Sequence, residues 1–511
     1  MPKTARKGTQ IPHATAPVEA IQGDPGVLLL LLSGLSDKPA SGRLLRGLTP
    51  YLDEEGARHV VLFAERRRKE PWSGASVAYG ELIHWARDAA DGVYRGAAWK
   101  QSGITRDEVV AAFQAQGTDV VDWAARRAGA ALVCNREPLL LEPCKVDKPW
   151  GREVWYTGIE KRGCSFVCSE TGRTELPYAL GMFPVPLVGE QERPPVLLKS
   201  LEPLPQEVLG DLYLEVHQEK WEVYVVLEVN REAWPDGVGR LRSGLAPAAI
   251  ERYRAGHGAA WPDALSLDLL AAIRAYEAVR RRIDAQFDQA LKARGLDPAQ
   301  GAPAALHAEL SAALVPALRD EERRLRGIVE EFLGTTPMPE GAVACLPPGV
   351  LHSLQHGVKV IEFQTPTYER LIAMFAQKVL TQPHWDSEAA IRRMDKAPYT
   401  PPAPELLEQG AGWKLERIVR FPEFQVQRLA LAPGGVRTSA TAGGANYQLA
   451  MGVVGAGTIK VSGRGPTPVE KETALLLPAT LGAYAIEAGV GGLTCLLTLP
   501  EEAAAPAAKS P

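Results

Sequence analysis

The sequence predicts a mainly β protein with α-helices. It indicates two β-domains, the first interrupted by a helical insertion, and a small α/β domain ahead of them. Runs of β-branched and aromatic residues broken by Gly and Pro recur over 150–232, 342–364 and 424–499. Helical periodicity fills 246–333, and short apolar runs alternate with helical stretches over 27–134. At 511 residues the chain is too long for one ordinary core, so several domains are expected.

Residues 26–137 are expected to form the α/β domain, whose role the sequence does not determine. The loop 33–42 lies between a strand and a helix but lacks the spacing of a phosphate-binding loop, so it is interpreted as a polar connection. The expected strands are Val27–Leu32, His59–Phe63 and Ala130–Cys134, and the expected helices are Arg43–Leu52, Tyr79–Val93, Arg106–Gln116 and Asp119–Ala128.

The first β-domain is predicted over 138–245 plus 334–383, because β patterns resume after the helices. Those helices, expected at Asp268–Arg294 and Ala304–Phe332, form the insertion 246–333. A Pro-rich passage predicts a linker over 384–412, followed by a second β-domain over 413–500. The remaining segments are expected to be a disordered tail, 1–25, and a low-complexity tail, 501–511.

Composition excludes several classes of partner. A net charge of −4 argues against nucleic acid and anionic membranes. The apolar run Val27–Leu32 is too short to span a bilayer and has no signal-peptide flanks, so a cytoplasmic protein is predicted. The six cysteines are sparse and predict no disulfide framework; Cys164 and Cys168 are interpreted as reduced structural thiols.

Two segments predict a metal site. One contains Gly341, Pro347 and His352 in the pattern G-x5-P-x-G-x2-H, and the other is Glu215-Val-His217-Gln-Glu-Lys-Trp-Glu222. On a strand, residues two apart share a face, so Glu215 and His217 point the same way. Two histidines and two carboxylates suit Zn²⁺, and Mn²⁺, Fe²⁺ or Ni²⁺ are compatible because sulfur is absent.

These segments resemble the paired metal-binding motifs of the cupin superfamily, and in particular those of class I mannose-6-phosphate isomerases. That family has Q-x-H, K-x-E and then G-x5-P-x-G-x2-H, with helices inserted between. The resemblance covers about 148–500 and implies two cupin (jelly-roll) β-barrels, of which the second is metal-free since no histidine follows His384. It implies the metal ligands Glu215, His217, Glu222 and His352.

Further matches extend the resemblance to a reaction, the isomerisation of mannose 6-phosphate and fructose 6-phosphate through a cis-enediol. The strand Val360-Ile-Glu362-Phe-Gln364 and the following Arg370 resemble the family's E-x-Q strand and catalytic arginine. The resemblance implies catalytic roles for Arg370, Lys220 and Glu362, and substrate contacts for Trp150 and Lys199. The implied partner is a sugar phosphate, and the oligomeric state is left open.

One departure from the family pattern concerns the metal directly. Glu215 stands where the family has Gln, so a metal would meet two carboxylates and polarise a sugar oxygen less. Two other functions therefore stay open. One is a different metal-cupin enzyme, such as a sugar epimerase or an Fe²⁺ dioxygenase; the other is a non-catalytic sugar-binding regulatory protein.

Overall fold

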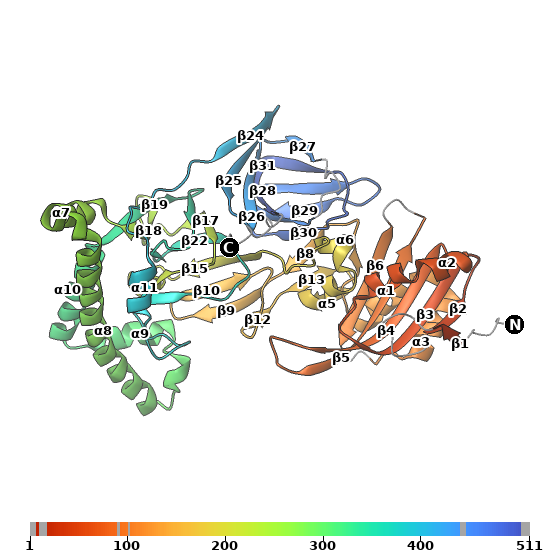
Figure 1. Ribbon diagram of the computed structural model, residues 1–511, viewed down its shortest axis with the longest axis horizontal. Coiled ribbons are helices and arrows are strands. Elements are labelled where there is room, and N and C mark those ends of the chain that lie inside the picture. The colour runs from red at the N-terminus through yellow and green to blue at the C-terminus, as the bar shows by residue number, and fades with distance from the viewer. Residues whose placement is uncertain (1–6, 10–17, 89–91, 101–102, 440–445, 502–511) are drawn as a thin grey trace, which may run out of the picture. The chain divides into compact units, whose positions relative to one another are not determined.

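The computed structural model describes residues 7–9, 18–88, 92–100, 103–439 and 446–501 (Figure 1). The chain divides into two compact units, 1–144 with 155–196 and 404–511, and 145–154 with 197–403. The predicted mainly β class is confirmed: several sheets dominate, and none of those in the described part closes on itself. None of the described helices combines the length and apolar character that crossing a lipid bilayer requires.

In the first unit, a seven-stranded sheet follows the order of the sequence. Only β3 and β4 pair in parallel, and the helices α1 (Ser41–Gly47) and α2 (Thr49–Glu54) make the crossover that a parallel pair needs. Two further helices, α3 (Arg106–Gln116) and α4 (Val120–Ala128), pack with the sheet in one hydrophobic cluster. The strands are β1 (Lys7–Thr9), β2 (Val18–Gln22), β3 (Val27–Ser36), β4 (His59–Lys69), β5 (Ser76–Ala86), β6 (Val93–Lys100) and β7 (Val133–Cys134).

The helix expected at Tyr79–Val93 is wrong, because Ser76–Ala86 is the strand β5. It pairs along its length with β4 and with β6, and most of its second half is buried. A short apolar run does not distinguish a buried strand from a buried helix. Here the pairing with the two neighbouring strands makes the segment a strand. The tail expected to be disordered over 1–25 includes β1 and β2, and the rest of it up to residue 17 lies outside the described residues, as does 502–511.

An eleven-stranded sheet is the other main sheet of the first unit. Residues 155–196, assigned to the metal-binding domain from sequence, fall in this unit, and β8 and β13 join its sheet through β30. All six cysteines are free, as predicted. The strands are β8 (Leu139–Glu142), β13 (Phe166–Ser169), β14 (Gly172–Glu175), β24 (Glu405–Gly410), β25 (Trp413–Arg420), β26 (Phe424–Leu431), β27 (Val436–Ser439), β28 (Gln448–Val461), β29 (Thr467–Glu470), β30 (Ala474–Leu477) and β31 (Tyr484–Pro500).

Smaller elements complete the first unit. The strands β11 (Ile159–Glu160) and β12 (Gly163–Cys164) form a hairpin, and α5 (Leu176–Gly181) and α6 (Pro184–Val188) are short buried helices. The passage expected as a linker, 384–412, contains β24 and, in the second unit, the helix α11 (Ser387–Arg393).

The second unit contains a six-stranded and a five-stranded sheet, which share one hydrophobic core. In the order of hydrogen bonding, the first sheet has β20 (Val343–Leu346), β17 (Glu222–Val229), β22 (Val358–Gln364), β15 (Leu197–Pro203), β10 (Gly151–Trp155) and β9 (Cys144–Lys148). The second has β19 (Leu333–Pro339), β18 (Val238–Leu245), β21 (His352–Leu354), β16 (Leu214–Val216) and β23 (Leu371–Met374).

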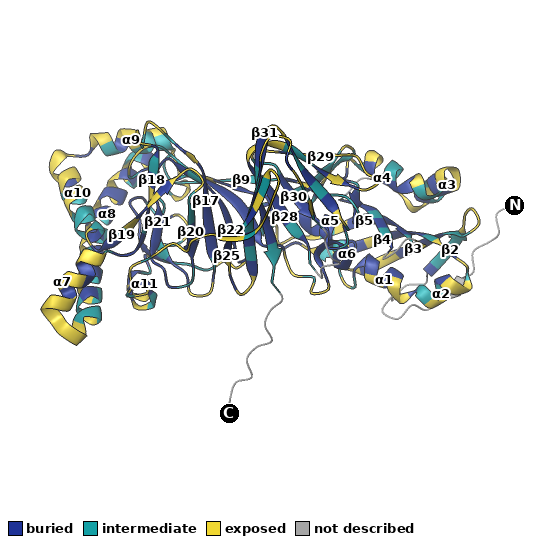
Figure 2. Cartoon of the chain, turned by 90° about the horizontal axis from the view of Figure 1, so that it is seen from above, coloured by how far each residue is buried: buried dark blue, intermediate teal, exposed yellow. Residues whose placement is uncertain are grey.

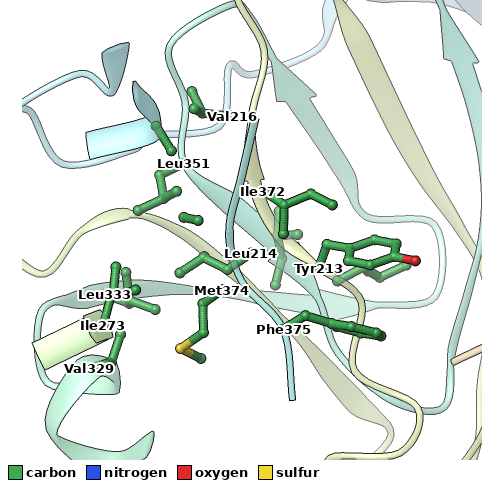
Figure 3. Packing of buried hydrophobic residues seen from close by; sticks show 14 of the residues in the cluster. Tyr213, Leu214, Val216, Ile273, Val329, Leu333, Leu351, Ile372, Met374 and Phe375 are labelled. Atoms are coloured by element: carbon green, nitrogen blue, oxygen red, sulfur yellow. The ribbon is translucent and has the colours of Figure 1, made fainter. Parts of the chain in front are cut away.

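Four helices connect β18 to β19, where the sequence predicts the insertion. They are α7 (Pro247–His257), α8 (Trp261–Ala293), α9 (Ala304–Ala313) and α10 (Pro316–Glu330). Their exposed and buried faces are distinct in Figure 2, as amphipathic helices require. Ile273 of α8 and Val329 of α10 lie near the strand residues Leu214 and Met374 in the same cluster (Figure 3). The insertion therefore packs on the sheet that carries β16 and β23.

Replacing Leu269 by alanine is expected to lower the free energy of unfolding by about 2–5 kcal/mol, because the side chain is fully buried in this cluster and its loss leaves a cavity. The same replacement at Leu267, two residues earlier on α8 and 68% exposed, is expected to cost less than about 0.5 kcal/mol. Urea unfolding of both variants measures the difference, and equal losses would contradict the packing of α8.

Candidate metal centre

Strand pairing brings the two sequence motifs together. Glu215 of β16 lies directly opposite His352 of β21 in an antiparallel ladder. His217 follows β16 two residues after Glu215, so the two side chains leave the same face of the strand. The turn before His352 is fixed to this strand, because the Gly349 N–H donates to the carbonyl of His217 at 2.9 Å.

Gly349 is required at this turn for two reasons. Its φ is 97°, which side-chain-bearing residues rarely adopt, and a Cβ there would lie 2.7 Å from an oxygen of Asp395. The glycine therefore lets the chain turn closely enough to direct His352 towards Glu215.

Glu222 reaches the same point from the other sheet. It begins β17 and is almost fully buried. Its Oε1 lies 3.3 Å from Nε2 of His217 and its Oε2 lies 3.4 Å from Nε2 of His352. Ligand atoms of Glu215, His217 and His352 also lie within 4.8 Å of one another. The structure thus gathers all four predicted ligands, three from the five-stranded side and one from the six-stranded sheet.

Both histidines have Nε2 available as a metal-binding atom. Nδ1 of His217 lies 3.1 Å from the carbonyl of Glu369, and Nδ1 of His352 lies 2.9 Å from that of Val350. A carbonyl accepts a proton from Nδ1, which leaves the lone pair on Nε2. Both Nε2 atoms are buried and have no hydrogen-bond partner among the described residues. These unpartnered nitrogens beside two carboxylates fit a divalent metal.

The charges in the centre suit a cation. Burial raises the pKa of Glu222, but the charge of Lys220 outweighs burial and holds the pKa well below its usual value. Burial also raises the pKa of Glu215, but the charge of Arg370 outweighs burial, so this pKa is lowered too. Burial lowers the pKa of His217, which keeps its imidazole neutral. Burial also lowers the pKa of His352, but Glu222 and Glu215 outweigh burial and raise it, so a metal bound at its Nε2 would replace a proton.

Glu369 was not identified from the sequence, yet it fixes the loop between His217 and Glu222. Its Oε1 accepts three successive backbone N–H groups, from Gln218 at 2.9 Å and from Glu219 and Lys220 at 3.0 Å. Together with the carbonyl contact to His217, this residue holds both ends of the loop. The sequence places it next to Arg370 but has no signal that separates it from a surface glutamate.

Lys220 and Arg370 each contact a predicted ligand. Nζ of Lys220 lies 2.6 Å from Oε1 of Glu222. A guanidinium nitrogen of Arg370 lies 3.8 Å from Glu215, and the group stacks 4.4 Å from the ring centre of Tyr213. The pairing of β16 with β23, which follows Arg370 directly, brings that side chain to Glu215.

A second buried pair lies on the six-stranded sheet. Lys199, Glu362 and Tyr224 are opposite one another on β15, β22 and β17, and Nζ of Lys199 lies 3.0 Å from Glu362. Burial and the negative charge of Glu222 raise the pKa of Glu362 well above its usual value, against the effect of Lys199. The pKa of Glu362 is therefore shifted in the direction that suits a carboxyl group exchanging protons with a substrate.

Trp150 lies between β9 and β10 and is buried in the hydrophobic core of the second unit. Its indole Nε1 has no hydrogen-bond partner among the described residues. The position is that of a core residue, so its predicted substrate contact stays a prediction.

Comparison with known proteins finds similarity to solved structures only. No protein-family model matches the chain, and no curated protein matches it. It is similar to mannose 6-phosphate isomerase from Bacillus subtilis, at 15% identity and a TM-score of 0.48, over 71% of this chain and 99% of that one. It is also similar to a variant of phosphomannose isomerase from Salmonella typhimurium, at 13% identity and a TM-score of 0.49, over 71% of this chain and 100% of that one. A zinc-bound mannose 6-phosphate isomerase is similar at 13% identity and a TM-score of 0.49, over 71% of this chain and 100% of that one.

Proposed function

We propose that this protein is a metal-dependent aldose–ketose isomerase acting on a phosphorylated sugar of the mannose 6-phosphate and fructose 6-phosphate type. The supporting observation is a buried centre of two histidines and two carboxylates on the sheets that also carry Glu362, a buried carboxyl group whose pKa is raised. Isomerisation between C1 and C2 needs a positioned group that takes up a proton and returns it.

Glu362 in its ionised form would be the base of this transfer, and Lys199 would protonate the C1 oxygen and take a proton back from the C2 oxygen. The base takes the proton from C2 of the aldose, and the electron pair of that C–H bond forms the C1–C2 double bond while the C1 oxygen is protonated. The resulting cis-enediol then receives a proton at C1, the C2 oxygen loses its proton and C2 becomes a carbonyl. No co-reactant is consumed, because the proton lost at one carbon is regained at the other.

The remaining site residues would bind and orient the sugar. Glu215, His217, Glu222 and His352 would hold a divalent metal, which would supply Lewis-acid stabilisation of negative charge on the sugar oxygens. Arg370, held by Glu215 and Tyr213, presents a fixed guanidinium suited to a phosphate, and Lys220 adds a second cation. Trp150 and Lys199 are the proposed contacts to the rest of the substrate.

The proposal extends to architecture and location. We propose that the six- and five-stranded sheets of the second unit are the two faces of a metal-binding jelly-roll barrel, and that 413–500 forms a second, metal-free one. A cytoplasmic location and the absence of a nucleic-acid partner stay predictions from composition.

The experiment strips the purified protein with a chelator, reloads it with Zn²⁺, Mn²⁺, Fe²⁺ or Ni²⁺ and measures fructose 6-phosphate formed from mannose 6-phosphate. Activity is expected to disappear on stripping and to return with at least one metal. Replacing Glu362 by Gln is expected to lower kcat by about 100-fold or more while metal content stays unchanged. Isomerisation absent with all four metals would contradict the proposal.

One observation favours a second function, an Fe²⁺-dependent oxygenase. Lys220 lies 2.6 Å from Glu222, whereas Glu215, His217 and His352 form a group of two histidines and one carboxylate. That ligand set is typical of non-haem Fe²⁺ oxygenases. Consumption of O₂ by the Fe²⁺-loaded protein with a sugar phosphate, without isomerisation, would favour this function.

A further inference from the structure

A cavity of about 630 Å³ lies within the helical insertion of the second unit. Its walls come from α8, α9, α10 and the loop 206–209. None of the proposed metal ligands or catalytic residues lines it. The volume is within the range of pockets that hold small molecules, roughly 300–1,000 Å³.

The lining carries four arginines and three glutamates, Glu207, Glu322 and Glu330. Arg319, Arg323 and Arg326 of α10 have helical spacing that places them along one side, and Arg280 faces them from α8. Arg319 and Arg323 are exposed at the rim, where the 3.6 Å ion pair of Arg323 with Asp320 is open to solvent and weak.

Two lining side chains carry a buried nitrogen that no described residue satisfies, Nε of Arg280 and Nε2 of His307. Nε of Arg326 lies 3.5 Å from a carboxylate oxygen of Glu322. Both arginines are otherwise engaged, Arg280 with Asp284 at 2.8 Å and Arg326 with Glu330 at 3.2 Å. Buried N–H groups without an acceptor are costly and call for an oxygen-bearing partner.

His307 adds a neutral donor. Burial and the nearby Arg280 lower its pKa to about 4, so its ring is uncharged at neutral pH. Its Nδ1 lies 3.3 Å from the hydroxyl of Ser311, which can donate to it. The ring proton is then on Nε2, the atom without a partner.

Gly327 lines the same cavity and leaves it open. A Cβ built at this position of α10 has no atom within 4 Å, so nothing in the described chain occupies that space.

We propose that the cavity is a second ligand site, which binds a metabolite-sized anion carrying a carboxylate or phosphate group. Arg319 and Arg323 supply the charge, because Arg280 and Arg326 are paired with carboxylates, while Nε of Arg280 and Nε2 of His307 supply hydrogen bonds.

The test is calorimetric titration of the full-length protein with succinate and, separately, with inorganic phosphate at constant ionic strength. At least one is expected to bind, and the one that does identifies the anionic group. Gly327→Leu is expected to weaken that binding at least about tenfold, because the side chain fills the cavity. Arg319→Gln with Arg323→Gln is expected to weaken it by a similar factor, because two cations are removed.

Gly256→Leu is the matched control. Gly256 lies in α7, outside the cavity lining, and also has open space at its Cβ position, so this variant is expected to bind as the parent does. Thermal unfolding checks that each variant is folded; leucine is the better helix former, so neither glycine replacement should unfold its helix. Absence of binding by both anions at tens of millimolar, or equal binding by the two leucine variants, would overturn the site. Metal content and isomerase activity are measured separately, so failure here is distinct from failure of the proposed function.

Discussion

Alanine in place of His217 or His352 is expected to lower zinc affinity by more than about 100-fold, so that the purified variants carry no stoichiometric metal. Each histidine presents a buried Nε2 that has no hydrogen-bond partner among the described residues and is oriented by a carbonyl at Nδ1. Loss of an orienting partner alone typically costs 10–100-fold in metal affinity, so loss of a ligand should cost more. Elemental analysis after dialysis and titration of the stripped protein measure both quantities.

His384→Ala controls for the substitution itself. His384 is a histidine of the same unit whose side chain is 67% exposed, and its replacement is expected to leave the metal content unchanged. Circular dichroism of all three variants separates loss of metal from loss of fold. Unchanged zinc stoichiometry in both His217→Ala and His352→Ala would contradict the assignment of these residues as metal ligands.

Glu369→Ala is expected to weaken metal binding by about 10–100-fold, although Glu369 is not a proposed ligand. Its carboxylate accepts the N–H groups of three consecutive residues in the loop that joins His217 to Glu222. Without it those donors lose a charged acceptor, and the loop is free to move His217 and Lys220. Titration of the stripped variant with zinc measures the loss.

Two further variants test whether Glu369 acts by positioning the loop that joins His217 to Glu222. Glu369→Gln keeps an acceptor oxygen at the same place, so it is expected to restore most of the affinity. Glu219→Ala removes an exposed carboxylate from the same loop and is expected to have no effect. Equal metal affinities for Glu369→Ala and the parent protein would show that the loop is held by other contacts.

Much of the candidate centre could be predicted from short-range patterns. Two-residue strand periodicity relates Glu215 to His217, and a Pro-Gly turn precedes His352. The structure brings these three residues together with Glu222. Their role as metal ligands stays a prediction, as do the catalytic roles of Lys220, Glu362 and Arg370.

Other features could not be predicted, because they depend on partners far away in the sequence. Ser76–Ala86 is a strand since β4 and β6 flank it, although its apolar run is equally compatible with a helix. Residues 166–169 pair with β8, which joins β30 of the C-terminal sheet, and no local pattern specifies that pairing. Glu369 is a half-buried anchor only because a loop 150 residues earlier directs three N–H groups at it.

The sequence by itself determined the mainly β class, the place of the helical insertion between two halves of one β-domain, and the identity of the residues that gather at the centre. These follow from periodicity and turn chemistry, which are local. The tertiary structure decided which strands pair, which carboxyl group has a raised pKa and where Arg280 and His307 place unpartnered nitrogens at a cavity. Those properties arise from burial and from contacts between distant segments, and local sequence patterns do not encode them.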